Sequence, residues 1–116
     1  MFETVKKNLE ARGYTVSCFE TAGQAADYLN TQIDNKTVGF GGSVTLKEMG
    51  LYEKLSTHNR ISWHGRIPEG KTDKEMRMEA READIYISSV NGLAETGEII
   101  NIDATGNRVA AIFYGH

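Results

Sequence analysis

This sequence has little cysteine, little proline and no long apolar run, and these shortages exclude whole classes of protein. A single cysteine, Cys18, cannot form an internal disulfide, whereas a secreted domain of 116 residues would usually need several. No apolar run approaches the roughly 20 residues of a membrane span, and the first residues lack the apolar region of a signal peptide. We therefore expect a cytoplasmic protein without membrane association, in which Cys18 is a packing side chain rather than a reactive thiol.

The chain also lacks an excess of positive charge and any metal-binding pattern. Its 13 basic and 16 acidic residues give a formal net charge of -3. General nucleic-acid binding is not expected, because it needs a basic face that neutralises phosphates. The three histidines, His58, His64 and His116, show no metal-ligand spacing, so we expect no metal and no cofactor. A small anionic ligand remains compatible with this charge, because backbone amides can bind one locally.

Helical and strand patterns alternate along the chain. Apolar residues recur at helical spacing from Phe2 to Leu9, and again after three threonines that have the spacing of capping boxes. These pairs are Thr21 with Gln24, Thr45 with Glu48, and Thr72 with Glu75. The helix that follows Thr45 is expected to break near Gly50. Runs rich in β-branched and aromatic residues predict strands over residues 14–19, 37–41, 60–64, 84–88, 98–102 and 108–113.

This alternation predicts one α/β domain over residues 1–116, with a mostly parallel sheet and helices on both faces. The two closing strands could pair as a hairpin, which would make the sheet mixed. The last expected strand ends almost at the C-terminus, without the helix that usually covers such a strand. Apolar surface would then stay exposed, and we expect a homo-oligomer to cover it.

The first candidate site is the segment from Gly39 to Thr45, in which a buried strand leads through glycines into a helix start. Glycine allows a ligand to approach the backbone closely, and the unpaired N–H groups of a helix start favour a phosphate or a carboxylate. Ser43 and Thr45 could add hydroxyl donors. The spacing matches neither a Walker motif nor the dinucleotide fingerprint, and a tight turn without a ligand explains the pattern equally well.

The second candidate site is the segment from Asn91 to Arg108, which is denser in polar residues and glycine than turns alone require. Asn101 and Asp103 are two residues apart, so on a strand their side chains would share a face. Ligands usually bind at the carboxyl ends of strands in open α/β sheets, so this segment is expected to face the glycine loop. Turn chemistry explains any single residue here about as well. The polar and charged members are Glu95, Glu98, Asn101, Asp103, Asn107 and Arg108.

Two stretches resemble the signatures of the LUD (lactate utilization) domain family. Residues 39–53, GFGGSVTLKEMGLYE, are similar to its glycine-rich signature. Residues 83–111, ADIYISSVNGLAETGEIINIDATGNRVAA, are similar to a second and more specific one. Order, spacing and intervening helices also agree, so the resemblance covers essentially the whole chain. It departs from the family after Tyr114, where relatives continue with further strand and helix and some carry a cysteine cluster.

The resemblance implies a Rossmann-like, three-layer fold of the kind shared by ribose-phosphate isomerases, glucosamine-phosphate deaminases (NagB/RpiA) and CoA transferases. It also implies a bacterial, cytoplasmic protein linked to lactate oxidation, where an iron–sulfur subunit is a partner. By motif position, the implied ligand-binding residues fall in the glycine loop and the facing segment. They are Gly41, Gly42, Ser43, Thr45, Asn91, Glu95, Asp103, Thr105, Gly106, Asn107 and Arg108.

Three hypotheses about function follow. The first is a domain that binds a small anionic metabolite or nucleotide-like ligand, as an accessory to organic-acid oxidation. The second, by analogy with CoA transferases, is an acyl-transfer enzyme in which Glu95 or Glu98 is the nucleophile. The third is a truncated interaction module that self-associates through an exposed strand edge.

Overall fold

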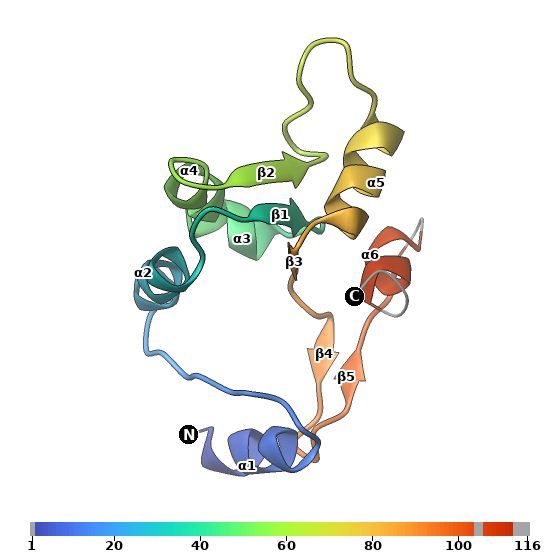
Figure 1. Cartoon of the computed structure of the whole chain (residues 1–116). Helices are drawn as coiled ribbons and strands as arrows, with labels where there is room; N and C mark the ends of the chain where they lie inside the picture. The colour runs from blue at the N-terminus through green and yellow to red at the C-terminus, as the bar shows by residue number, and fades with distance from the viewer. Residues whose placement is uncertain (1, 104–105, 113–116) are drawn as a thin grey trace.

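The computed structural model describes residues 2–103 and 106–112, and its centre is a three-stranded parallel sheet (Figure 1). The strands are β1 (Thr37–Phe40), β2 (Arg60–Trp63) and β3 (Ile85–Ile87), in the order β2-β1-β3. In the central strand, Val38 is opposite Ile61 on one side and Ile85 on the other. The sequence places a helical segment between each pair of strands, as parallel pairing requires.

The two faces of β1 are covered differently, as the period-two alternation of a strand dictates. Val38 and Phe40, which are almost fully buried, point into a core that also holds Leu51 and Leu55. Gly39 points to the opposite face, where the backbone of Ala80 lies against it. The predicted three-layer arrangement, with helices on both faces of the sheet, is therefore confirmed.

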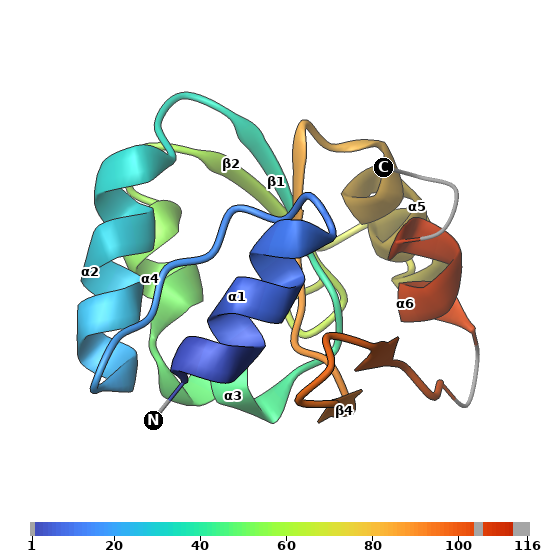
Figure 2. The ribbon, with the colours of Figure 1, turned by 90° about the horizontal axis from the view of Figure 1, so that it is seen from below.

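Three helices cover the Val38 face of the sheet, and one covers the Gly39 face (Figure 2). The first three are α2 (Ala22–Gln32), α3 (Val44–Glu48) and α4 (Leu51–Leu55). Gly50 separates α3 from α4 in a left-handed conformation with φ 66°, which confirms the predicted break. The opposite face carries α5 (Asp73–Glu82), which buries Met76 and Ala80 against the sheet.

An extension projects from this body and consists of α1 (Glu3–Ala11) and a short antiparallel ribbon (Figure 1). The ribbon pairs β4 (Gly92–Leu93) with β5 (Ile99–Ile100), and its turn contacts α1. The Asn8 amide donates to the Glu95 carbonyl, and Arg12 forms an ion pair with Glu98 at 3.0 Å. With this extension, the molecule has principal extents of 47 × 29 × 22 Å.

Two predicted strands are wrong. Residues 14–19 are extended but pair with no strand, because they run from α1 to α2 away from the sheet. Residues 108–110 belong to α6 (Asn107–Ala110), and residues 111 and 112 continue it as a wider helical turn. Residue 113, the last of that predicted strand, lies outside the described residues. The antiparallel pair at the end of the fold is therefore β4 with β5, and it starts earlier than expected.

One predicted helix cap is also displaced. The Ser43 hydroxyl, and not that of Thr45, accepts from a backbone N–H at the start of α3, that of Leu46 at 3.2 Å. Both Ser43 and Thr45 have a hydroxyl that could cap a helix. Because α3 begins at Val44, directly after Ser43, the Ser43 hydroxyl takes the cap position. The other two caps are as expected, with Thr21 accepting from Gln24 and Thr72 accepting from Glu75.

Candidate functional site

The candidate site lies at the carboxyl ends of β1 and β3, where the chain leaves neighbouring strands in diverging directions. After β1 the chain crosses through α3 and α4 to β2 on one side, whereas β3 lies on the other side of β1. Open α/β sheets bind ligands at such a switch point, since the divergence leaves a crevice between the two loops. The loop after β1 contains Gly41, Gly42 and Ser43, and the loop after β3 runs from Ser88 to Asn91.

Arg108 joins the two predicted segments. Its Nη2 donates to the Gly42 carbonyl at 2.7 Å, and its Nη1 donates to the Asn91 side-chain oxygen at 2.9 Å. Its side chain is only 12% exposed, and its bond to Gly42 is partly buried, whereas its bond to Asn91 is open to solvent. Sixty-six positions separate Arg108 from Gly42 in the chain, and the structure brings them into direct contact.

Asn91 and Asp103 hold the arginine in place. The Asn91 Oδ1 also accepts from the Ile102 N–H at 2.9 Å, which ties the two sides of the β4–β5 ribbon together above the crevice. One Asp103 oxygen accepts from the Val109 N–H at 2.7 Å, and the other lies 3.9 Å from Arg108 Nη2. Asp103 is 13% exposed, so its charge is partly balanced by the arginine in a site with little water.

The glycine loop is packed tightly against residues from the other two strands. A Cβ at Gly41 would lie 2.7 Å from the Tyr86 hydroxyl oxygen and 3.0 Å from the Ser88 Cβ. A Cβ at Gly42 would lie 3.3 Å from the His64 ring. Burial raises the pKa of Tyr86, so its phenol is neutral and can donate a hydrogen bond at neutral pH. The loop therefore needs small residues for close packing.

Several buried polar atoms around this loop have no hydrogen-bond partner within the described residues. They are the Nδ1 of His64 and the Nε of Arg108, whose side chains contact Gly42, and the Oδ1 of Asn101 on the Asn91–Arg108 segment is also unpartnered. Buried polar atoms in proteins are usually paired, so each such atom indicates a water, an ion or a ligand that would satisfy it. These three combine donors and an acceptor beside a cationic side chain.

The stability of the protein should depend on the charge of His64. Burial lowers the pKa of His64 from 6.5, and the charge of Arg77 lowers it further, whereas Asp73 raises it. The folded protein therefore disfavours the protonated ring, and this cost is absent above pH 6.5. Stability should fall as the pH drops from 6.5 through the lowered pKa. Urea unfolding between pH 7.5 and 5 should show a smaller loss for His64→Gln than for the wild type; equal losses would contradict this.

Other residues predicted for the site lie elsewhere. Thr45 is an exposed residue of α3 that faces the α1 side of the molecule. Glu95 and Glu98 lie in or beside the exposed turn of the ribbon, next to α1. The Thr96 hydroxyl, the backbone and Arg12 lower the pKa of Glu98. That carboxylate is solvated and already paired, so the geometry lends no support to the acyl-transfer hypothesis.

The remaining predicted residues precede or begin α6. Gly106 takes the left-handed conformation with φ 76° and precedes the helix, and Asn107 begins it. Both line a groove beside α5. Thr105 lies outside the described residues.

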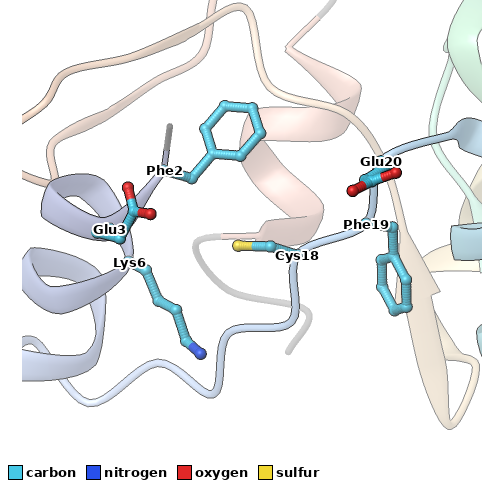
Figure 3. A pocket seen from close by; sticks show the side chains of 6 residues that line it. All are labelled: Phe2, Glu3, Lys6, Cys18, Phe19 and Glu20. Atoms are coloured by element: carbon cyan, nitrogen blue, oxygen red, sulfur yellow. The ribbon is translucent and has the colours of Figure 1, made fainter.

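A separate hollow of about 580 Å³ lies beside α1 (Figure 3). Phe2, Glu3 and Lys6 line it from the α1 side, and Cys18, Phe19 and Glu20 line it from the segment that leads to α2. Its described lining includes neither Gly42 nor Arg108, and it contains three charged side chains, those of Glu3, Lys6 and Glu20. We place the candidate site at the glycine loop, where the two predicted segments meet.

Two residues of this site are absent from the candidates that the sequence indicates. The sequence excludes His64 only as a metal ligand, and it places Tyr86 within the predicted strand over residues 84–88. His64 directly follows β2, at the same edge of the sheet as Gly41. The parallel sheet was already expected, so the position of His64 at a strand's carboxyl end was a usable signal.

The described residues contain no group of three or more histidine, cysteine or acidic side chains that could hold a metal ion. None of the described helices is long and apolar enough to cross a membrane.

Comparison with known proteins identifies the family. The model of the LUD domain matches residues 2–116, almost the whole chain. Searches of curated proteins and of solved structures gave no match. The glycine loop and the Asn91–Arg108 segment, which first suggested this resemblance, are the parts that meet at the switch point, where Arg108 bonds to Gly42 and Asn91. The chain belongs to the LUD domain family, and this membership associates it with lactate utilization.

Proposed function

We propose that this domain binds a small anionic metabolite in the crevice between the glycine loop and Arg108, as an accessory to organic-acid oxidation. The observation that supports it most is that His64 and Arg108, which both contact Gly42, each carry a buried polar atom without a hydrogen-bond partner among the described residues. The unpartnered Oδ1 of Asn101 lies on the same segment as Arg108. A ligand with anionic oxygens and a hydroxyl group would accept from the arginine and donate to the asparagine.

Each group has a distinct role in this proposal. Arg108 supplies the positive charge and a planar set of donors that suits carboxylate or phosphate oxygens. Its bond to the Gly42 carbonyl fixes its orientation before the ligand arrives, which reduces the entropy cost of binding. His64, which its surroundings keep neutral, can donate or accept a hydrogen bond without adding charge. No catalytic step is assigned to any of these residues.

The proposal is tested by calorimetric titration with lactate, phosphorylated sugars, CoA and nucleotides. Gly42→Val should weaken binding of whichever ligand binds by about tenfold or more, because the added side chain must displace the His64 ring. Gly23→Val is the matched control, since a Cβ at Gly23 would meet only the Thr21 hydroxyl at 3.9 Å. If no ligand binds, or if both variants match the wild type, the crevice is not the binding site.

A further inference from the structure

Another hollow lies in the groove between α5 and α6, whose residue Asn107 directly precedes Arg108 of the candidate site. Its volume is about 570 Å³. Lys74, Arg77, Met78 and Arg81 line it from α5, and Asn107 lines it from the start of α6. Counted from position 74, the four α5 residues stand at i, i+3, i+4 and i+7, so they share one face of that helix.

The groove is strongly cationic for a protein of net charge -3. Its described lining contains three cations and one carboxylate, that of Asp73, which accepts from Arg77 Nε at 2.7 Å. Lys74 forms no ion pair among the described residues, and neither does Arg81. The Arg81 Nε is buried and has no hydrogen-bond partner there either. Like charges gathered in one groove repel each other, and a bound anion would reduce this repulsion.

Charged residues of the groove act on the pKa values of His64 and Tyr86, and Arg108 of the crevice also acts on that of Tyr86. Burial lowers the pKa of His64, and Arg77 on the groove wall lowers it further. Burial raises the pKa of Tyr86, whereas Arg108 in the crevice and Arg77 and Arg81 in the groove all act to lower it. Both His64 and Tyr86 border the glycine loop. The two sites also adjoin along the chain, because Asn107 of the groove directly precedes Arg108, which contacts Gly42.

We propose that the α5–α6 groove binds the phosphate or diphosphate group of the ligand whose other end occupies the crevice. This inference rests on the proposed function and narrows its ligand to a phosphorylated compound, of the nucleoside diphosphate kind, rather than a free hydroxy acid. A monocarboxylate offers one negative charge and two acceptor oxygens, fewer than the unpaired cations and donors of the groove could bind. A diphosphate offers several charges and acceptor oxygens, which match the two unpaired cations and the Arg81 Nε of the groove.

Calorimetric titrations with pyrophosphate, ADP and L-lactate test this inference. ADP and pyrophosphate should bind at least about tenfold more tightly than L-lactate, and added salt should weaken them more. The double variant Lys74→Gln/Arg81→Gln should weaken ADP and pyrophosphate by about tenfold to a hundredfold and change L-lactate binding by less than about twofold. It keeps the Arg77–Asp73 pair, and its thermal unfolding should show that it remains folded. The double variant Lys7→Gln/Lys36→Gln removes the same charge from exposed positions elsewhere and should change nothing.

The outcomes separate this inference from the proposed function. If Gly42→Val abolishes binding but the α5 double variant matches the wild type, the groove inference is wrong and the crevice stands. If the α5 double variant weakens pyrophosphate binding but Gly42→Val leaves the affinities for ADP and L-lactate unchanged, the groove inference stands and the crevice proposal is wrong. Equal affinity for ADP and L-lactate, or no binding of ADP and pyrophosphate, would also overturn the groove inference.

Discussion

Gly39→Ala should lower the free energy of unfolding by about 3 kcal/mol, at the upper end of the usual cost of overpacking. A Cβ at this position would lie 2.2 Å from the Ala80 carbonyl oxygen and 2.5 Å from its Cα. Both atoms belong to the backbone, so a rotamer change cannot relieve the clash, and α5 must move away from the central strand. That movement would also loosen the buried Met76 and Ala80. Urea unfolding followed by circular dichroism measures the change.

Gly23→Ala is the control for this result. Gly23 lies in the first turn of α2 with open space around it, so alanine should be neutral or stabilise by up to about 1 kcal/mol. A fall of more than about 10 °C in Tm is expected for Gly39→Ala, but not for the control. Similar stabilities of the two variants would show that β1 and α5 do not pack as described.

Arg108→Met should both destabilise the protein and remove ligand binding. Methionine keeps much of the arginine's volume, but the Gly42 carbonyl and the Asn91 Oδ1 lose a charged donor. Asp103, which is 13% exposed, also loses its nearby positive charge. Breaking such a partly buried, charged hydrogen-bond set should cost about 2 to 3 kcal/mol. Chemical unfolding and calorimetric titration together measure the two effects.

Two further arginine variants separate charge, geometry and location. Arg108→Lys keeps the positive charge but lacks the planar fork, so it should retain part of the stability and lose most of the ligand affinity. Arg12→Met removes an arginine whose ion pair with Glu98 is about half exposed. Its cost should stay near or below about 1 kcal/mol, and ligand binding should not change. A larger loss for Arg12→Met than for Arg108→Met would contradict the account of the site.

The parts of the fold with strong local signals could be predicted from the sequence. The α2 and α5 helices have both an apolar stripe and a capping threonine, and both begin where these signals place them. The three strands of the sheet were expected from short apolar runs that alternate with helices. Gly50 marked the break between α3 and α4, because a left-handed residue there suits glycine.

The wrong strands show what local patterns leave undecided. The run from Tyr14 to Phe19 has the composition of a strand, but a strand also needs a partner, and this segment has none. The run from Arg108 to Ile112 has two adjacent alanines between Val109 and Ile112, and alanine favours helices. Of the β4–β5 pair, the sequence predicts a strand at β5 but none at β4. The reason is that β4 is only Gly92 and Leu93, too short to produce a pattern.

The candidate site was predictable to the level of segments but not of contacts. The sequence indicated that the glycine loop and the Asn91–Arg108 segment would face each other, and the Arg108–Gly42 hydrogen bond joins them. It did not separate Asn91, Asp103 and Arg108 from Glu95 and Glu98, because the ribbon turn carries the latter two away toward α1. Such a separation depends on long-range folding rather than on spacing.

Self-association and an iron–sulfur partner subunit stay predictions. Exposed apolar side chains do lie on or next to the ribbon, among them Leu93 at 47%, Ile100 at 50% and Ile102 at 73% exposure. An exposed apolar patch of this kind suits burial by another protein surface, either a second copy of the chain or another subunit.

The central claim is that the crevice between Gly42 and Arg108 binds an anion. Its most direct test is a two-dimensional ¹H–¹⁵N NMR titration with ADP and L-lactate that follows the Arg108 Nε–H and the amides of Gly42, Ser43 and Asn91. We expect the Arg108 Nε–H and the loop amides to shift in a saturable manner, while the amides of the ribbon turn at residues 95–98 stay in place. Shifts confined to that turn or to α1, or no saturable shift with either ligand, would contradict the claim.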